Sequence, residues 1–343
     1  MKYTTLLKLG LCLAFLYGCN PIEKVGPDIC PSDQFSLTVE DLVINVVSPG
    51  SSQPLEDVGN ALDLTSEGLN IQSNFGEEVP WILTLSNGSQ TKTFSGTGES
   101  LNVYWYGQPD KFDGAKMQFD EGAVTAELSV VCFEAVSKTF QLSGTQNFST
   151  LDSNFGVLLR DWDKNGAYPV DDVTYDAENQ VDGWSGKGGG VDVWEFQYYD
   201  THSSPAGGLY AQFHAAGENG MWYLGSHSFT LTDFEDIIPT QNVDSLYVNI
   251  FASAEEGAIN TGSQIAVKYN GKSYLALENI NWSGWKLLSY KMADLKTTSG
   301  DILPSTDITD FVLQLGASPE PSNDLKVRYD FVLITVGAPL FTE

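Results

Sequence analysis

The spacing of turn residues is the feature that most constrains this chain. After residue 32, short runs of β-branched and aromatic residues alternate with clusters of Gly, Asn, Asp, Ser and Pro. Such runs are typical of β-strands joined by tight turns. We find no segment with apolar residues at the helical spacing of three and four, so we expect almost no helix. The sequence therefore predicts an all-β protein.

The strand pattern divides into two halves. Runs such as "VPWILTLSN" and "SLNVYWYG" indicate about seven strands in the first half, with a hairpin turn at "SNGS" (86–89), as in an immunoglobulin-like sandwich. The stretch 143–154 is small and polar, as domain boundaries often are. About eight strands follow, which is the count of a jelly roll. We therefore expect an immunoglobulin-like β-sandwich at 33–146 and a jelly-roll β-sandwich at 147–343.

The first residues have the pattern of an export signal. Lys2 and Lys8 precede an apolar run, Leu9–Tyr17, that is too short to span a bilayer. The run ends in "LYGC", which resembles the lipobox of bacterial lipoproteins, in which cleavage leaves an acylated Cys19 as the first residue. An ordinary secretory signal with an incidental cysteine is the alternative. We expect a signal peptide at 1–18 and a lipid-anchored tether at 19–32.

Two cysteines remain beyond the signal and the anchor, Cys30 and Cys132. An exported protein folds in an oxidising compartment, where an even pair of cysteines favours a disulfide. We therefore expect a Cys30–Cys132 bridge that ties the start of the first domain to its body. Two free buried thiols are the alternative.

The charge of the chain is strongly acidic. It has 17 Lys+Arg against 45 Asp+Glu, a formal net charge of −28. Such a surface repels nucleic acid, anionic lipid headgroups and strongly anionic polysaccharides. We therefore expect no nucleic-acid partner, whereas neutral ligands and cations are compatible with this charge.

Several strands of the second half have an aliphatic side and a second side that mixes aromatics with amides. Alternation in "GLYAQFHA" puts Gln212 and His214 on one face, and alternation in "SLYVNIFAS" puts Asn249 opposite Val248 and Ile250. A sheet face that met only water would rarely carry so many aromatics. Pyranose rings stack on aromatic rings, and their hydroxyls bond to amides. The pattern indicates a sugar-binding face, with packing in the core as the alternative for each ring.

One further tryptophan lies in a segment that cannot bury it alone. The glycine-rich stretch "QVDGWSGKGGG" contains Trp184 and Lys187. Side chains on such loops are commonly exposed and available for binding. We therefore expect Trp184 to stack on a sugar and Lys187 to donate a hydrogen bond to it.

Four stretches together resemble one known family. "GGLYAQFHAAGENGMWYL", "SLYVNIFASAE", "GWKLLSYKMADL" and "YDFVLITVG" are similar to the carbohydrate-binding domain of the surface glycan-binding lipoproteins that Bacteroidetes encode beside TonB-dependent importers. The resemblance covers roughly residues 155 to 341. It implies a galactose-binding-like jelly roll on the outer membrane, facing the cell exterior, from a polysaccharide utilisation locus. It also implies a glycan platform of Trp222, Tyr223 and Trp282, with Trp285 structural.

An acidic stretch, "DWDKNGAYPVDD", has the spacing of a calcium loop. Asp161, Asp163 and Asn165 stand at positions one, three and five, and Asp172 at position twelve. No helices flank it and position twelve is not Glu, so we do not expect an EF-hand. A structural Ca²⁺ held with help from Asp330 of the closing strand is one interpretation, and a solvated acidic turn is the other.

Enzyme signatures are missing from the sequence. It has no HExxH, no G-x-S-x-G and no E-x-D-x-x-E run. We therefore expect a non-catalytic lipoprotein that captures a neutral polysaccharide, such as a β-glucan, for an outer-membrane importer. A glycoside hydrolase or lyase, and an adhesin or scaffold without a glycan site, are the alternatives. Alternation puts Trp222 and Tyr223 on opposite faces, and we expect Trp222 to face outward.

Overall fold

The structure of the 343-residue chain is a computed structural model. It describes residues 36–112, 116–148, 151–161, 184–187, 194–199, 204–206, 210–216, 223–230, 243–255, 259, 264–269, 272–294, 296–297, 310–317 and 324–341. Side chains are described for 36–112, 116–148, 151–159, 204–206, 210, 244–255, 259, 265, 278–294 and 326–341. The secondary structure in these ranges is β-strand with short 3-10 turns, so the all-β prediction is confirmed. No helix in these ranges is long and apolar enough to span a membrane.

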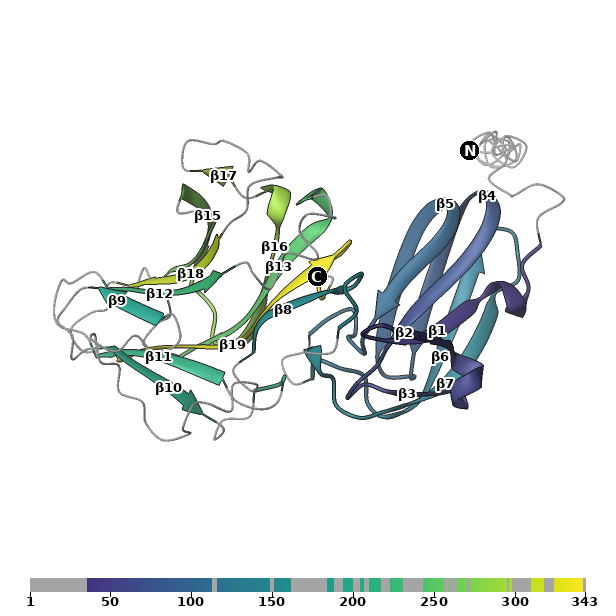
Figure 1. The fold of residues 1–343 in the computed structure, drawn as a ribbon, viewed down its shortest axis with the longest axis horizontal. Helices are drawn as coiled ribbons and strands as arrows, with labels where there is room; N and C mark the ends of the chain where they lie inside the picture. Colours follow the sequence, from purple (N-terminus) through teal and green to yellow (C-terminus); the bar gives the residue numbers. More distant parts are fainter. Residues whose placement is uncertain are drawn as a thin grey trace, which may run out of the picture.

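The first structural unit is one curled sheet of seven strands (Figure 1). The strand order is β2-β1-β4-β6-β7-β3, and β5 pairs with β4. The pair β3–β7 is parallel and the others are antiparallel. The elements are β1 (Val43–Ser48), β2 (Ser51–Pro54), β3 (Ala61–Asp63), β4 (Gly68–Ser86), β5 (Thr91–Trp105), β6 (Gly122–Val130) and β7 (Val136–Ser143), with 3-10 turns η1 (Val39–Asp41) and η2 (Leu55–Val58).

The long strands β4 and β5 are joined by the predicted hairpin turn. The side-chain oxygen of Asn87 accepts hydrogen bonds from the backbone N–H groups of Ser89 and Gln90, at 3.1 and 2.8 Å. Gly88 has a φ of +90°, which glycine adopts at little cost. The turn expected at 86–89 is therefore confirmed, and its residue chemistry explains it.

Trp105 is at the centre of the core of this unit. It is fully buried, and its ring meets Phe119 and Phe140 edge to face, with centroids 5.1 and 6.1 Å apart. Its indole N–H donates to the backbone oxygen of Gln108 at 2.8 Å. The ring thus packs in apolar surroundings without leaving its one polar group unpaired.

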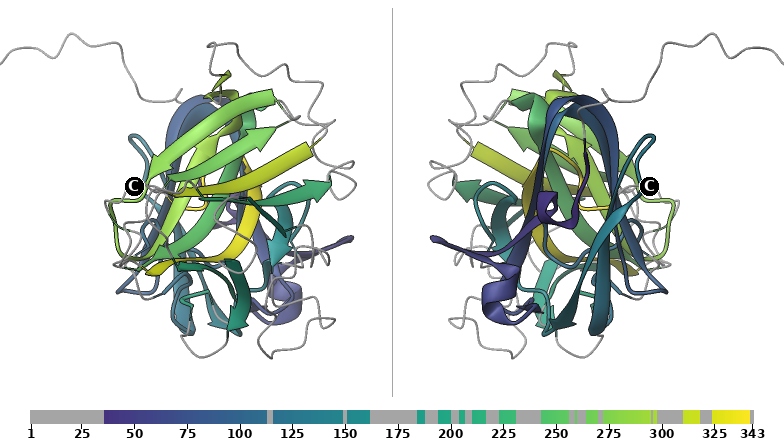
Figure 2. Two further views of the ribbon diagram at one scale, coloured as in Figure 1. Left: turned by 90° about the vertical axis from the view of Figure 1, so that its left-hand side faces the viewer. Right: turned by 90° about the vertical axis from the view of Figure 1, so that its right-hand side faces the viewer.

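The second unit is a pair of antiparallel sheets (Figures 1 and 2). The junction sheet contains β8 (Gly156–Asp161), β10 (Trp194–Tyr199), β11 (Tyr210–Ala216), β13 (Leu246–Ala254), β16 (Gly284–Lys291) and β19 (Asp324–Val336). The distal sheet contains β9 (Trp184–Lys187), β12 (Tyr223–Thr230), β14 (Gln264–Tyr269), β15 (Lys272–Asn279), β17 (Lys296–Thr297) and β18 (Asp310–Ala317). Two 3-10 turns, η6 (Val243–Ser245) and η8 (Met292–Asp294), flank β13 and β16.

The change from the first unit to the second falls between Ser143 and Gly156. In the described part of the chain, no strand of β1–β7 pairs with a strand of β8–β19. The boundary at 146/147 remains our assignment within this interval. The last described residues run back from β19 to the first unit, so the C-terminal end lies at the junction (Figure 1).

An apolar cluster joins the two units. We call it the junction cluster: Val47, Tyr106 and Met117 of the first unit, Phe148 and Phe155 of the connecting stretch, and Phe251, Phe331, Leu333, Leu340 and Phe341 of the second unit and the C-terminal segment. Phe251 is fully buried, and its ring stacks on Phe331 with centroids 5.4 Å apart. Phe112 of the first unit meets Phe251 edge to face at 5.2 Å. Aromatic burial of this kind holds two units in one arrangement.

Cys132 is disulfide-bonded. It follows β6 and has a φ of +74°, which is uncommon for a residue with a side chain. The other cysteines of the chain, Cys12, Cys19 and Cys30, lie outside the described residues. The predicted partner Cys30 therefore stays a prediction, as does the lipid anchor at Cys19.

We predict that Phe251→Ala will uncouple the two units. Removing a fully buried phenylalanine costs about 3–5 kcal/mol of unfolding free energy, because it leaves a cavity. Differential scanning calorimetry should show a lower unfolding temperature and separate transitions for the two units. Ile82→Ala, at a position that is 49% exposed, is the control. A Phe251→Ala profile like that of the control would contradict the role of the cluster.

Candidate functional site

The polar and aromatic side of β13 does not form a ligand surface. Both sides of this strand are buried from Val248 to Ala254. Leu246, Val248 and Ile250 pack on one side, as expected, whereas Phe251 on the other side packs in the junction cluster. The expectation of a sugar-binding face is therefore wrong for β13, because Phe112 of the first unit and the C-terminal segment pack on this side of the strand.

Asn249 is the clearest correction among the predicted glycan contacts. It is fully buried. Its amide N–H groups donate to the Leu333 carbonyl and the Thr335 hydroxyl, at 3.3 and 3.0 Å. Its amide oxygen accepts from the Ser289 hydroxyl at 2.8 Å and the Leu340 backbone N–H at 3.0 Å. These bonds occupy both the donors and the acceptor of the amide. Asn249 therefore holds β13, β16 and the C-terminal segment together and cannot contact a glycan.

The other predicted contacts are divided between the two sheets. Gln212 and His214 are in β11 of the junction sheet, opposite Arg328 and Lys326 of β19. Trp184, Lys187 and Tyr223 are on the adjacent strands β9 and β12 of the distal sheet. Only the backbone of these five residues is described, so their roles as glycan contacts stay predictions.

The backbone register of the distal sheet bears on the choice between Trp222 and Tyr223. Gly225 of β12 pairs with Leu315, which pairs with the fully buried Ile265. Position 223 is two residues from Gly225, so it belongs to the same face as Ile265. Trp222 lies outside the described residues, and its expected outward orientation stays a prediction.

Trp282 is in the loop between β15 and β16 and is half-buried. The ammonium of Lys286 lies 5.7 Å from its ring centroid, and Lys286 also pairs with Glu278 at 2.9 Å. A cation in this position interacts favourably with the indole face. The structure thus gives Trp282 a packing role on one side, and its sugar contact stays a prediction.

The predicted calcium ligands fall mostly outside the described side chains. Asp330 is 2% exposed and accepts a hydrogen bond from the Ser204 hydroxyl. Asp161 ends β8 opposite Phe331, next to Asp330. Asp163 and Asn165 lie outside the described residues. The described residues contain no group of three acidic, His or Cys side chains that could hold a metal, and Ca²⁺ stays a prediction.

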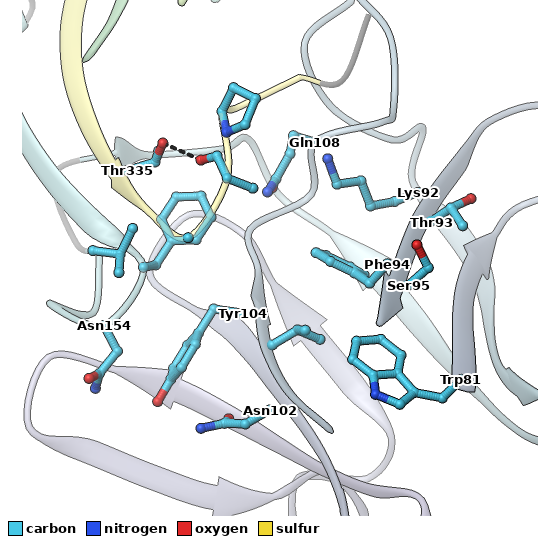
Figure 3. Close-up of a pocket in the computed structure, with 16 residues that line it drawn as sticks. Trp81, Lys92, Thr93, Phe94, Ser95, Asn102, Tyr104, Gln108, Asn154 and Thr335 are labelled. Carbon is cyan, nitrogen blue, oxygen red and sulfur yellow. Dashed lines mark hydrogen bonds between the residues drawn. The ribbon is translucent and has the colours of Figure 1, made fainter. Parts of the chain in front are cut away.

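A cavity of about 540 Å³ lies between the two units (Figure 3). We call it the junction cavity. Strands β4 and β5 of the first unit form one wall, and residues 154–155 with the segment 335–339 form the other. Its volume is within the roughly 300–1,000 Å³ of small-molecule sites. The sequence did not predict a site here.

Three half-buried aromatic rings line the junction cavity. Figure 3 shows Trp81 and Phe94 on one side and Tyr104 on the other. Trp81 faces Gly96 across β4 and β5, and a Cβ at Gly96 would lie only 2.6 Å from the indole. Because Gly96 has no side chain, the indole of Trp81 can lie directly against the sheet at this position. Burial raises the pKa of the Tyr104 hydroxyl, and Asp152 adds to the rise, so this hydroxyl stays protonated.

Amide side chains supply directional hydrogen bonds around these rings. Gln108 is 3% exposed, and its side-chain oxygen accepts from the Tyr106 backbone N–H at 2.9 Å. Its NH₂ group therefore points to the cavity (Figure 3). The side-chain oxygen of Asn102 accepts from the Asn70 amide at 2.6 Å, which leaves the Asn102 NH₂ as a donor. The donors of the wall are thus oriented before any ligand binds.

Lys92 is the one charged residue among the described residues that line the cavity. It is 3% exposed, and its ammonium donates to the Leu340 carbonyl at 3.5 Å. Burial lowers the pKa of Lys92 to about 8, although the charge of Asp110 acts to raise it. No carboxylate of the described residues lies within ion-pair distance of this ammonium.

Sequence analysis missed these residues because it looked for a sugar-binding face only in the second half, which has most of the tryptophans. One signal was present in "QTKTFSG". Alternation places Lys92 and Phe94 on the same, inward face of a strand, where a lysine is rarely found. The partner wall, residues 335–339, comes from the far end of the chain and could not be located without the fold.

We predict that Lys92→Met will stabilise the protein at neutral pH. Because the folded state lowers the pKa of Lys92 from 10.5 to about 8, the folded state binds this proton less tightly than the unfolded chain does. The loss of folding stability caused by burying this ammonium is therefore complete below pH 8, and it disappears as the pH rises to 10.5. The variant should gain about 3 kcal/mol at pH 7 and less at pH 10, measured by urea unfolding.

Lys116→Met is the control for the lost charge, because the Lys116 side chain is 56% exposed. It should change the unfolding free energy by no more than about 0.5 kcal/mol. A Lys92→Met variant that is no more stable than wild type at pH 7 would show that the buried ammonium is fully compensated.

No family model and no curated protein matches the chain. Among solved structures it is similar to a carbohydrate-binding module of the β-sandwich superfamily, at 8% identity over 85% of this chain and 98% of that one, with a TM-score of 0.34. A family 11 carbohydrate-binding module from a cellulosomal cellulase of Clostridium thermocellum has 12% identity over 50% of this chain and 97% of its own, with a TM-score of 0.29.

A third similar structure is SGBP-B from a complex xyloglucan utilization locus in Bacteroides uniformis. It has 9% identity over 78% of this chain and 68% of its own, with a TM-score of 0.33. Likenesses at this distance do not assign a ligand or a site. The function below is therefore built on the residues of this chain.

Proposed function

We propose that this protein is an exported, lipid-anchored lipoprotein that binds a glycan and catalyses no reaction on it. The junction cavity is the observation that carries the proposal. Its wall combines aromatic rings with oriented amides and hydroxyls in a space large enough for a small ligand. Sugars need both kinds of contact, because a pyranose has apolar C–H faces and a rim of hydroxyls.

The lining of the junction cavity supports binding over hydrolysis. Glycoside hydrolysis needs two carboxylates on either side of the scissile bond. None of the described lining residues is Asp or Glu. The alternative, a glycoside hydrolase or lyase, would be supported if the purified protein released reducing ends from a glycan that it binds.

We further propose that Cys19 anchors the protein in the outer membrane, facing outward, beside a TonB-dependent importer. "LYGC" and the polar tether behind it support the anchor. Metabolic labelling with a fatty acid should mark the wild-type protein and not Cys19→Ala. Equal labelling of the two proteins would contradict the anchor, and co-purification with an importer would test the partner.

Trp81→Ala should weaken glycan binding. Loss of a stacking indole removes apolar contact worth about 1–3 kcal/mol, which corresponds to roughly fivefold to 150-fold in affinity. Affinity gel electrophoresis against β-glucans, xyloglucan, xylans and mannans measures the effect. Ile82→Ala is the matched control, because Ile82 is the next residue on β4, is 49% exposed and does not line the cavity.

Trp222→Ala in the same gels separates the junction cavity from the predicted platform of the second unit. If the cavity is the main site, Trp81→Ala loses retardation and Trp222→Ala keeps most of it. The reverse result would move the site to the second unit. A wild-type protein that no glycan retards, or retardation unchanged in both variants, would count against glycan binding by aromatic stacking.

A further inference from the structure

Two buried side chains in the wall of the junction cavity carry donors that the protein leaves largely unused. Lys92 and Gln108 are each 3% exposed, and both line the cavity. The ammonium of Lys92 has three N–H groups, yet its hydrogen bond to Leu340 is 3.5 Å long, beyond the usual range. The Gln108 NH₂ makes no hydrogen bond to a described residue, whereas its oxygen is held by Tyr106.

The charge around Lys92 is unusual for this chain. Acidic residues outnumber basic ones by 45 to 17, yet the described lining of the cavity contains this lysine and no carboxylate. The carboxylate of Asp110 acts on Lys92 from outside the lining and accepts a hydrogen bond from the Thr93 backbone N–H at 2.9 Å. The ammonium also lies 5.6 Å from the centroid of the Phe94 ring, which is a weaker partner than a carboxylate. A buried charge without a carboxylate at ion-pair distance is costly, so its retention needs a reason.

A carboxylate on the ligand would supply the missing partner. It offers only acceptors, and the two wall groups in question are both donors. With a pKa of about 8, Lys92 is mostly protonated at pH 7 and therefore cationic. Hydrogen bonds between an ammonium and a carboxylate are charge-assisted and stronger than neutral ones.

We infer that the junction cavity binds a glycan bearing a uronate residue, whose carboxylate pairs with Lys92 and Gln108 while a sugar ring stacks on Trp81. This inference rests on the proposed function. A net charge of −28 repels a densely anionic polymer. The ligand is therefore a largely neutral glycan with isolated carboxylates, which refines the expected neutral polysaccharide.

Pairs of oligosaccharides that differ only at the carboxylate test the inference. Oligosaccharides from glucuronoxylan, xanthan, alginate and pectin are immobilised beside their carboxyl-reduced forms, and binding is measured for wild type, Lys92→Met and Lys116→Met. Wild type should bind a glucuronoxylan or xanthan fragment at least about tenfold more tightly than its reduced form. In Lys92→Met that ratio should fall to near one, and in Lys116→Met it should persist.

The outcomes separate this inference from the proposed function. Binding of neutral or carboxyl-reduced glycans with no preference for the acidic form overturns the uronate subsite and leaves glycan binding standing. A preference that Lys92→Met retains, or binding to alginate or pectin alone, also overturns it. If no glycan of either kind binds, both proposals fail. Because Lys92→Met is expected to be the more stable protein, unfolding would not explain a lost preference.

Discussion

Stacking around Phe251 is the contact on which the arrangement of this protein depends. Its ring lies between Phe331 and Trp285, at 5.4 and 4.8 Å, and receives the edge of Phe112 from the first unit. Hydrophobic burial is non-directional, but offset and edge-to-face ring contacts restrict orientation. The cluster therefore both holds the two units together and sets the angle at which the junction sheet meets β4 and β5. The placement of residues 335–339 over β4 and β5, and with it the junction cavity, follows from that angle.

Polar contacts fasten the end of the chain onto this apolar frame. Asn249 bonds to the Leu340 backbone at 3.0 Å, and the ammonium of Lys92 reaches the Leu340 carbonyl from the first unit. The two bonds differ in quality. The amide of Asn249 is saturated, as a buried polar group should be, whereas the ammonium has one long bond and a lowered pKa. The Asn249 amide stabilises the fold, whereas burial of the Lys92 ammonium lowers the stability of the fold. A buried group that costs stability is the pattern expected of a binding group.

Local patterns predicted the elements well and their surroundings poorly. The turn at 86–89 followed from Asn and Gly, whose backbone preferences act within four residues. Alternation correctly sorted Val248 and Ile250 from Asn249 and Phe251, but it could not tell whether the second face met water, a sugar or another sheet. For the same reason the sequence directed attention to the second unit, and the cavity between β5 and the segment 335–339 went unseen. The segment 335–339 is separated from β5 by more than two hundred residues of chain.

By itself the sequence determined the all-β class, the hairpin turn at 86–89 and the two-faced character of the strands, because these depend on neighbours within a few residues. It also suggested a sugar ligand, because aromatics and amides recur together. The tertiary structure decided which of those faces are covered and which groups meet across the junction. Burial is a property of the assembled chain, so only the fold could turn Asn249 into a structural bond and leave Lys92 as a buried cation beside three aromatic rings.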